Sequence, residues 1–325
     1  MKNRQGKCWY AIGFAIAFIV LVIHSYRLNF ENGEAKKPGF FYSDRSIYYV
    51  YLPATFIYHW DANRFPARID TLNRGFILDT VTGKVINKMT YGVALFHLPF
   101  FISAHTIAKT TGLDADGFSM IYQLTALLPP VLFLLLGIIY LKRFLSFYFS
   151  PPVAWTVPVL VFTGTNLFHY ALIEGLMSHV YSFFLFALFL FLLKKMILRG
   201  NPSTGLWAGL CITLALIVLI RPVNGLIGLS FLMLDVQSWK DLRHRFMIVI
   251  KPARLAILLT IVLLVFLPQM IYWYYLSGNI IHYSYGKEGF SHILQPAFLP
   301  VLFSTLNGWL IYTPLAIFMI IGALM

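Results

Sequence analysis

Acidic residues are scarce in this sequence, and so is charge of either sign. Of the 325 residues only 12 are Asp or Glu, and only 11% are charged, whereas a soluble domain has about a quarter of its residues charged. Apolar residues make up 59% of the chain, and its mean hydropathy is +0.75. This composition excludes an ordinary soluble enzyme and a disordered tail protein, and it predicts a protein that lives in a lipid bilayer.

Cysteine is nearly absent, and the common catalytic and metal-binding motifs are missing. Cys8 and Cys211 belong to no Cys-x-x-Cys spacing, so neither a disulfide framework nor a zinc site is indicated. The nine histidines form no His-Glu-x-x-His pattern. No Gly-x-Ser-x-Gly, Walker or Gly-x-Gly-x-x-Gly sequence occurs, so the sequence contains no motif for serine hydrolysis or for nucleotide-driven transport. We therefore expect no cofactor.

The excess of basic residues is large, with 25 Lys and Arg giving a net charge of +13. These residues lie between apolar runs and form no single stripe, so their expected counterparts are anionic lipid headgroups and phosphate-bearing substrates. Nucleic acid is not an expected partner.

Nine stretches contain no Asp, Glu, Lys or Arg and are candidates for crossing a membrane. They are Cys8–Tyr26, Met89–Ala108, Gly117–Leu141, Phe144–Ile173, Gly175–Leu193, Gly200–Ile220, Pro222–Leu234, Leu255–Gly286 and Gly289–Met325. The pattern predicts an all-α, polytopic transmembrane bundle of about eight to ten spans. The seventh stretch is short, so Gly200–Leu234 is predicted to form a hairpin with Arg221 near its tip.

The chain is treated as one domain, residues 1–325, and its ends differ in character. Basic residues precede the first apolar run and no small-residue cleavage site follows it, so we expect an uncleaved anchor with a cytoplasmic amino terminus. The last apolar run reaches Met325 without a closing loop, which suggests a fragment of something longer.

The positive-inside rule places three basic segments in the cytoplasm: Lys142–Arg143, Lys194–Arg199 and Lys240–Arg254. Two crossings separate each from the next, so they agree with one another. They disagree with a cytoplasmic amino terminus if Met89–Ala108 crosses the membrane. Either that stretch is re-entrant or interfacial, or part of residues 48–60 enters the membrane, or one basic segment breaks the rule.

The first loop, residues 27–88, holds six of the twelve acidic residues. Its Ser46–Trp60 segment is uncharged and contains five aromatic rings before Trp60. This pattern predicts helices lying in the headgroup layer, and packing against the bundle is the open alternative. Asp44 precedes the segment, where it is either a general base partly desolvated among tyrosines or a helix N-cap. Lys88 is either an interface anchor or a phosphate ligand.

Two acidic residues stand alone between long apolar runs. Glu174 lies in a short polar break, and Glu288 lies in a loop with two glycines and two tyrosines. An ionisable group at membrane depth costs several kcal/mol unless it is paired or solvated, so both are functional candidates. The alternative for each is a loop charge at the interface.

Several short motifs in this order resemble the integral-membrane C-type glycosyltransferases, in particular the bacterial family 39-related members. They are Asp44–Tyr49, Asn87–Leu95 with Pro99–Phe101, Met177–His179, Arg221–Asn224, and Tyr283–Phe290 followed by Leu302–Ser304 and Asn307–Gly308. The resemblance covers most of the chain, although each motif is short. Members usually have more spans and often a carboxy-terminal soluble domain.

The resemblance implies roles for particular residues. Asp44 takes the place of the catalytic base, and Glu174 takes that of a second acid that is more commonly Asp. Lys88, and more loosely Arg221 and Lys287, would hold the lipid phosphate. Contacts to sugar or acceptor would come from Arg45, Tyr48, His179, Tyr285 and Glu288. Some relatives use a divalent metal and others do not.

The function expected from these features is transfer of a sugar from a polyprenyl-phosphate donor to a hydroxyl of a lipid, glycan or protein. The expected location is the outer face of a bacterial plasma membrane, with membrane lipids as further partners. A flippase of lipid-linked saccharides is the alternative, although no repeat of two similar halves is found. A polymerase or ligase of lipid-linked glycans would share the chemistry.

Overall fold

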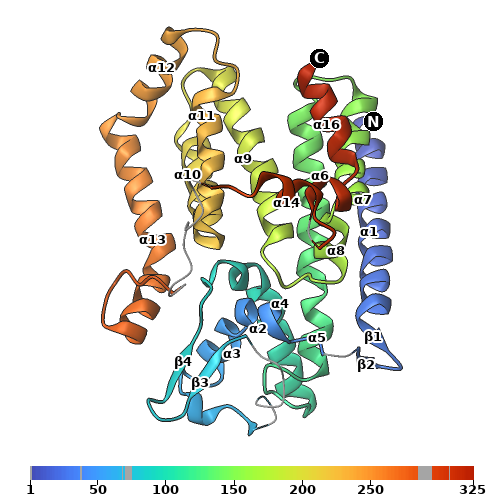
Figure 1. Ribbon diagram of the computed structural model, residues 1–325, viewed down its shortest axis with the longest axis vertical. Coiled ribbons are helices and arrows are strands. Elements are labelled where there is room, and N and C mark those ends of the chain that lie inside the picture. The colour runs from blue at the N-terminus through green and yellow to red at the C-terminus, as the bar shows by residue number, and fades with distance from the viewer. Residues whose placement is uncertain (1, 37–38, 68, 70–74, 285–294, 307) are drawn as a thin grey trace.

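The computed structural model describes residues 2–36, 39–67, 69, 75–284, 295–306 and 308–325. Within them the chain is mostly helical, and its strands form two short antiparallel hairpins (Figure 1). The all-α class expected from the apolar runs is therefore confirmed.

The first part of the chain is one long helix followed by a layer of short elements. Their bounds are α1 Lys2–Asn29, β1 Phe30–Glu31, β2 Glu34–Ala35, α2 Ser43–Tyr49, α3 Tyr51–Phe56, the 3-10 helix η1 Ala62–Arg64, β3 Ile77–Asp79, β4 Lys84–Ile86, α4 Gly92–Thr111 and α5 Met120–Ala126.

The second part forms most of the upright bundle. Its elements are α6 Leu128–Leu145, α7 Pro151–Gly164, α8 Leu167–Leu172, α9 His179–Arg199, α10 Thr204–Ile220, the 3-10 helix η3 Pro222–Leu229, α11 Ser230–Met233, α12 Trp239–Val249, α13 Pro252–Ser277, α14 Phe298–Phe303, α15 Trp309–Tyr312 and α16 Leu315–Leu324.

Four helices are long and apolar enough to cross a membrane: Trp9–Asn29, Met120–Leu145, His179–Arg199 and Pro252–Ser277. The first and the last of these helices face mostly outward, since only 6% and 11% of their most apolar residues are buried within the protein. Apolar surface on this scale suits lipid rather than water. Four shorter apolar helices accompany them in the described part of the chain, and the count of about eight to ten spans stays a prediction.

The described residues form two apolar cores. One lies within the layer of short elements and is built on residues such as Phe41, Tyr49 and Phe101. The other runs between the upright helices, with Leu134, Leu185 and Ile217 fully or almost fully buried. Tyr48 belongs to the second core although it stands on α2, so this helix joins the layer to the bundle.

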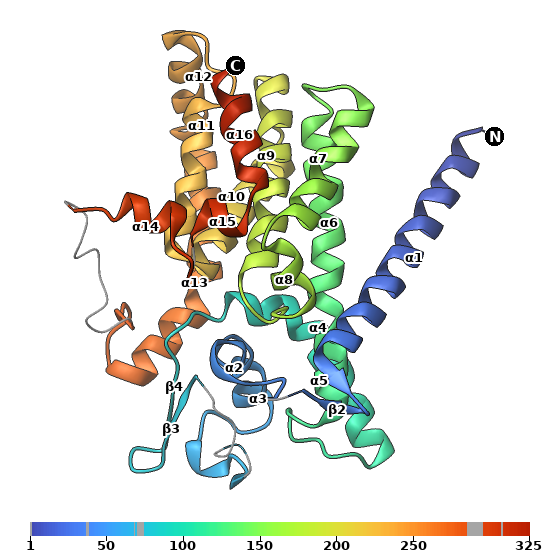
Figure 2. The same ribbon diagram turned by 45° about the vertical axis from the view of Figure 1, so that its right-hand side comes forward.

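Helix α4 belongs to the layer and is not one of the long apolar spans. It contacts α2, α3 and α5, and it lies with them at the end of the bundle opposite the amino terminus (Figures 1 and 2). The ends of α6 and α9 and helix α12, which carry the basic segments, lie at the end where α1 begins (Figure 1). The basic segments and the amino terminus thus share one end of the bundle, and the predicted disagreement between them does not arise because α4 does not cross the bundle.

The aromatic segment at residues 46–60 packs inside the protein. Tyr48, Tyr49 and Tyr51 are at most 5% exposed, whereas Phe56 is exposed. The packing alternative therefore describes these rings better than a helix lying on the headgroups. The predicted hairpin is present, with Arg221 joining α10 to η3.

A close contact between α4 and α10 requires glycine at position 92. A Cβ atom there would meet the Ile220 Cγ1 atom at 2.9 Å and its backbone nitrogen at 3.1 Å. We expect Gly92→Ala to lower the free energy of unfolding by about 1–3 kcal/mol, because the first turn of α4 must move. Denaturant unfolding in detergent measures this loss.

Gly205→Ala is the matched control, because Gly205 also lies in a first helical turn and nothing lies within 4 Å of its added Cβ. It should leave stability unchanged or raise it by up to about 1 kcal/mol. Equal effects of the two substitutions would contradict the close contact.

Candidate functional site

The segment Asn87–Gly92 lies where the layer meets the bundle, and it connects three helices. The Asn87 side chain donates to the Ile47 carbonyl of α2 at 2.8 Å, and the Asn87 backbone N–H bonds to the Tyr272 hydroxyl of α13 at 2.7 Å. The Thr90 hydroxyl donates to the Leu219 carbonyl near the end of α10. These bonds hold the backbone at Lys88 close to the end of α10, where Arg221 follows.

Arg221 lines a polar cavity of about 260 Å³ between the ends of α8, α9 and α10. Its other polar lining residues include His179, Ser182 and Asn224, and the His179 ring stacks on Tyr170 with 3.7 Å between centroids. Across the described residues, the Arg221 guanidinium makes no hydrogen bond or ion pair, although its residue is only partly exposed. An unpaired arginine in a cavity suits an anionic ligand.

Helix α2 does not line this cavity but contacts one of its lining residues. The Tyr48 hydroxyl lies 3.4 Å from the Ser178 hydroxyl, and Ser178 is a lining residue. Asp44 lies one turn before Tyr48 on the same face of α2. Its side chain is exposed, so the expected partial desolvation is absent from the free protein, and Tyr42 rather than Asp44 is the N-cap residue.

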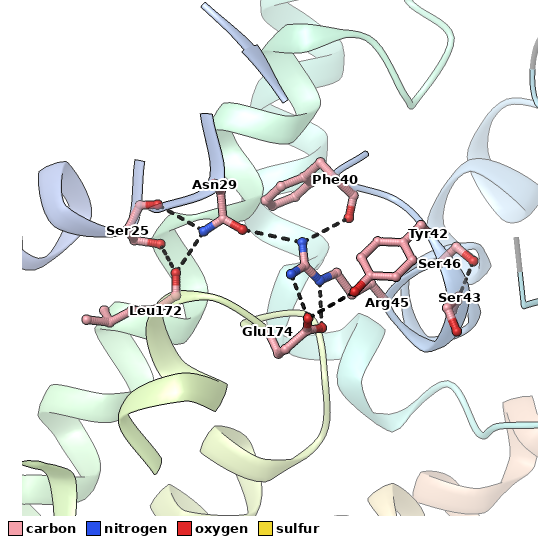
Figure 3. A network of polar contacts seen from close by, with 9 residues as sticks. All are labelled: Ser25, Asn29, Phe40, Tyr42, Ser43, Arg45, Ser46, Leu172 and Glu174. Atoms are coloured by element: carbon pink, nitrogen blue, oxygen red, sulfur yellow. Dashed lines mark hydrogen bonds and ion pairs between the residues drawn. The ribbon is translucent and has the colours of Figure 1, made fainter. Parts of the chain in front are cut away.

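Glu174 is held by Arg45 in a partly buried ion pair (Figure 3). Arg45 Nε lies 2.6 Å from Oε2 and Nη2 lies 2.8 Å from Oε1, so the guanidinium holds both carboxylate oxygens. The Tyr42 hydroxyl donates to Oε1 at 3.3 Å. The two side chains are only 7% and 15% exposed.

The pair extends into a network that reaches the first span (Figure 3). Arg45 Nη1 donates to Asn29 Oδ1 at 3.3 Å, and Asn29 Nδ2 donates to the Leu172 carbonyl at 2.8 Å. The Ser25 hydroxyl donates to the same carbonyl at 2.7 Å. The network thus joins α1, α2 and the break between α8 and α9.

The ion pair gives Glu174 and Arg45 a structural role, and the catalytic and substrate-binding roles expected for them stay predictions. Burial raises the pKa of Glu174, whereas the hydrogen bonds and the charge of Arg45 lower it. The lowering effects together are larger, so the pKa of Glu174 lies below its usual value. A carboxylate kept ionised with its oxygens occupied is unsuited to proton transfer. The Arg45 guanidinium is likewise occupied, because it donates to Glu174, Asn29 and the Phe40 carbonyl.

An apolar cleft of about 600 Å³ lies beside the Asn87–Gly92 segment, between α3, α4 and α13. Tyr51, Tyr91, Leu98 and Ile271 are among its lining residues. Tyr91 is the residue of the Asn87–Gly92 segment that lines the cleft, and the Tyr51 hydroxyl donates to the Met89 carbonyl at 2.6 Å. A larger cavity of about 800 Å³ lies farther away, around Phe40, and contains none of the predicted residues.

Three predicted residues, Tyr285, Lys287 and Glu288, lie outside the described residues. The chain just before them is placed, since the Ser284 hydroxyl donates to the Lys88 carbonyl at 2.6 Å. The sequence did not indicate Tyr42 or Asn29 as members of this network. No local pattern shows that Tyr42 binds the Glu174 carboxylate or that Asn29 binds the Arg45 guanidinium.

No group of three His, Cys, Asp or Glu side chains that could hold a metal ion is present in the described part of the chain. Comparisons of the sequence with protein-family models and curated proteins, and of the structure with solved structures, found no match. The resemblance to the C-type glycosyltransferases therefore stays a prediction from the sequence motifs alone.

Separating Arg45 from Glu174 should destabilise the protein strongly. We expect Arg45→Met or Glu174→Gln to lower the free energy of unfolding by about 3–5 kcal/mol, because each leaves a buried charge without its partner. Replacing both residues with methionine should cost less than either single change. Arg64→Gln, which breaks an exposed pair with Asp61, is the control and should cost about 1 kcal/mol or less.

The same pair predicts a pH dependence. The pKa of Glu174 is lower in the folded than in the unfolded chain, so its contribution is complete above the ordinary carboxyl pKa and is lost as pH falls through the folded pKa. The stability gap between wild type and Glu174→Gln should shrink in acid. A gap that stays constant from neutral to acidic pH would contradict the ion pair.

Proposed function

We propose that this protein is a membrane glycosyltransferase that moves a sugar from a polyprenyl-phosphate donor to an acceptor hydroxyl. The observation that carries the proposal is the convergence of three separate segments: α2 with Asp44, the Asn87–Gly92 segment with Lys88, and the end of α10 with Arg221. They meet where the layer joins the bundle, beside one polar and one apolar cavity.

The donor has two chemically different parts, and the site offers a surface for each. A phosphate needs cationic donors, which Lys88 and Arg221 supply. A polyprenol needs an apolar surface, which the cleft between α3, α4 and α13 supplies. Tyr91 of the Asn87–Gly92 segment lines this cleft, so a donor with its tail in the cleft would bring its phosphate toward this segment.

The chemistry then requires a base more than an acid. The acceptor oxygen attacks the anomeric carbon, the bond from that carbon to the phosphate oxygen breaks, and Asp44 takes the hydroxyl proton. Polyprenyl phosphate leaves with its electron pair, and the cations stabilise the added charge. One displacement inverts the anomeric centre. Because Asp44 is exposed in the free protein, bound donor and acceptor must provide its desolvation.

The arrangement also suggests a sidedness. The basic ends of α6 and α9, helix α12 and the amino terminus share one end of the bundle (Figure 1). The positive-inside rule assigns that end to the cytoplasm. The layer with Asp44 then belongs to the outer face of a multi-pass protein, where lipid-linked sugars, glycans and secreted proteins are accessible.

Asp44→Asn should abolish transfer while leaving expression and donor binding nearly unchanged, because the amide cannot accept the proton. The measurement is release of labelled polyprenyl phosphate from a panel of polyprenyl-phosphate sugars by purified protein. Glu34→Gln, at another exposed acid of the first loop, is the matched control. Retained turnover in Asp44→Asn would remove this residue as the base, and movement of lipid without sugar release would identify a flippase.

Arg221→Gln and Lys88→Ala should raise the KM for the donor by about tenfold or more, since a hydrogen bond to a charged group contributes about 1.5–3 kcal/mol. The KM for the acceptor should change much less. Arg199→Gln removes an exposed arginine at the opposite end of the bundle and should change neither constant. An unchanged donor KM in Arg221→Gln and Lys88→Ala would contradict the phosphate site.

A further inference from the structure

Helix α12 presents an unusual surface at the end of the bundle opposite the candidate site (Figures 1 and 2). Its outward face carries large apolar side chains, with Trp239 85%, Phe246 62% and Met247 48% exposed. Two exposed cations, Lys240 and Arg243, lie on the same face. The opposite face, with Arg245 and Ile248, is buried against the bundle.

The basic residues around α12 fall into two groups. Three of them bind backbone carbonyls: His244 bonds to Gly200 at 2.8 Å, Arg245 donates to Phe231 at 2.6 Å, and Arg254 donates to Pro202 at 3.2 Å. By contrast, Lys240, Arg243 and Lys251 are exposed, and their side chains form no hydrogen bond or ion pair within the described residues. The first group fixes the helix, and the second is available to a ligand.

The position of α12 is defined by more than its own contacts. Asp235, in the turn that precedes the helix, accepts hydrogen bonds from Lys194 at 2.6 Å and from Tyr148 at 2.9 Å. Asp241 accepts from the Ser238 backbone N–H at 2.9 Å and closes the first turn. The outward face is therefore presented by a fixed helix and not by a mobile loop.

We propose that the outward face of α12, formed by Trp239, Lys240, Arg243, Phe246 and Met247, binds an anionic phospholipid surface. A helix with aromatic and apolar side chains beside lysine and arginine suits the boundary between headgroups and acyl chains, where the rings enter and the cations meet phosphates. Helix α13, one of the four long apolar helices, begins at Pro252 only three residues after α12 ends. The face therefore lies at the end of a membrane-crossing segment.

Charge favours lipid over a second protein as the occupant. No acidic side chain is exposed on the outward face, and the one acid of the helix, Asp241, is engaged by backbone N–H groups. The cations would therefore repel a second copy of this strongly basic chain, whereas anionic headgroups attract them. The proposal is independent of the glycosyltransferase function, because α12 contains none of the residues assigned to transfer.

The test uses the full chain with Met247→Cys labelled by a polarity-sensitive dye, in a Cys8→Ser background. Cys211 is buried and stays in place. Phosphatidylglycerol or phosphatidylcholine is titrated into the protein in neutral detergent, and the midpoint of the blue shift in dye emission is recorded. We expect the phosphatidylglycerol midpoint to be about tenfold lower than that of phosphatidylcholine, and salt to reduce the difference.

Lys240→Gln with Arg243→Gln should raise the phosphatidylglycerol midpoint by about tenfold or more, because each cation near an anionic surface contributes a factor of about five. Arg27→Gln with Lys109→Gln removes the same charge from exposed positions at the other end and should leave the midpoint unchanged. Three results would overturn the proposal: equal midpoints for the two lipids, equal loss in the control, or a blue shift without lipid that grows with protein concentration, which would identify a second copy as the occupant.

Discussion

The ion pair between Arg45 and Glu174 determines how the first loop sits on the bundle. Taking either charge out of water costs several kcal/mol, and the cost is recovered only when both partners are present with good geometry. The two carboxylate oxygens bind two guanidinium nitrogens. Tyr42 donates a further hydrogen bond to the carboxylate, and Asn29 accepts one from the guanidinium. Helix α2 therefore has one favourable position, and the placement of Asp44, Tyr48 and the Ile47 carbonyl follows from it.

Most of the helical framework could be predicted from the sequence because it depends on local composition. Long uncharged runs become helices such as α9 and α13, and the Arg221–Pro222 break becomes a hairpin, since proline and glycine interrupt a helix wherever they occur. The place of α4 could not be predicted in this way. Its run looks apolar, but two histidines and Pro99 lower its hydropathy, and its burial in the layer depends on partners distant in sequence.

The candidate site was only partly predictable, for a related physical reason. A lone glutamate between apolar runs is compatible with catalysis and with a buried ion pair, and the two differ only in whether a cation faces it. For Glu174 that cation lies 129 positions earlier in the chain, in a loop whose local pattern says nothing of the pairing. Lys88 and Arg221, by contrast, lie in local breaks of the helical pattern, Lys88 shortly before α4 and Arg221 directly after α10, where side chains can face a cavity.

The large basic excess therefore separates into groups that composition cannot distinguish. Arg45 binds a carboxylate, and Arg245 and Arg254 bind backbone carbonyls, so their charge stabilises the fold. Arg221 at one end of the bundle, and Lys240 with Arg243 at the other, are left without protein partners in the part of the chain that the structure describes. A charge that the protein does not neutralise must meet solvent or an anion. Apolar side chains lie beside the unpaired cations of α12, and an amphiphilic phosphate is the class of ligand that we propose at both ends of the bundle.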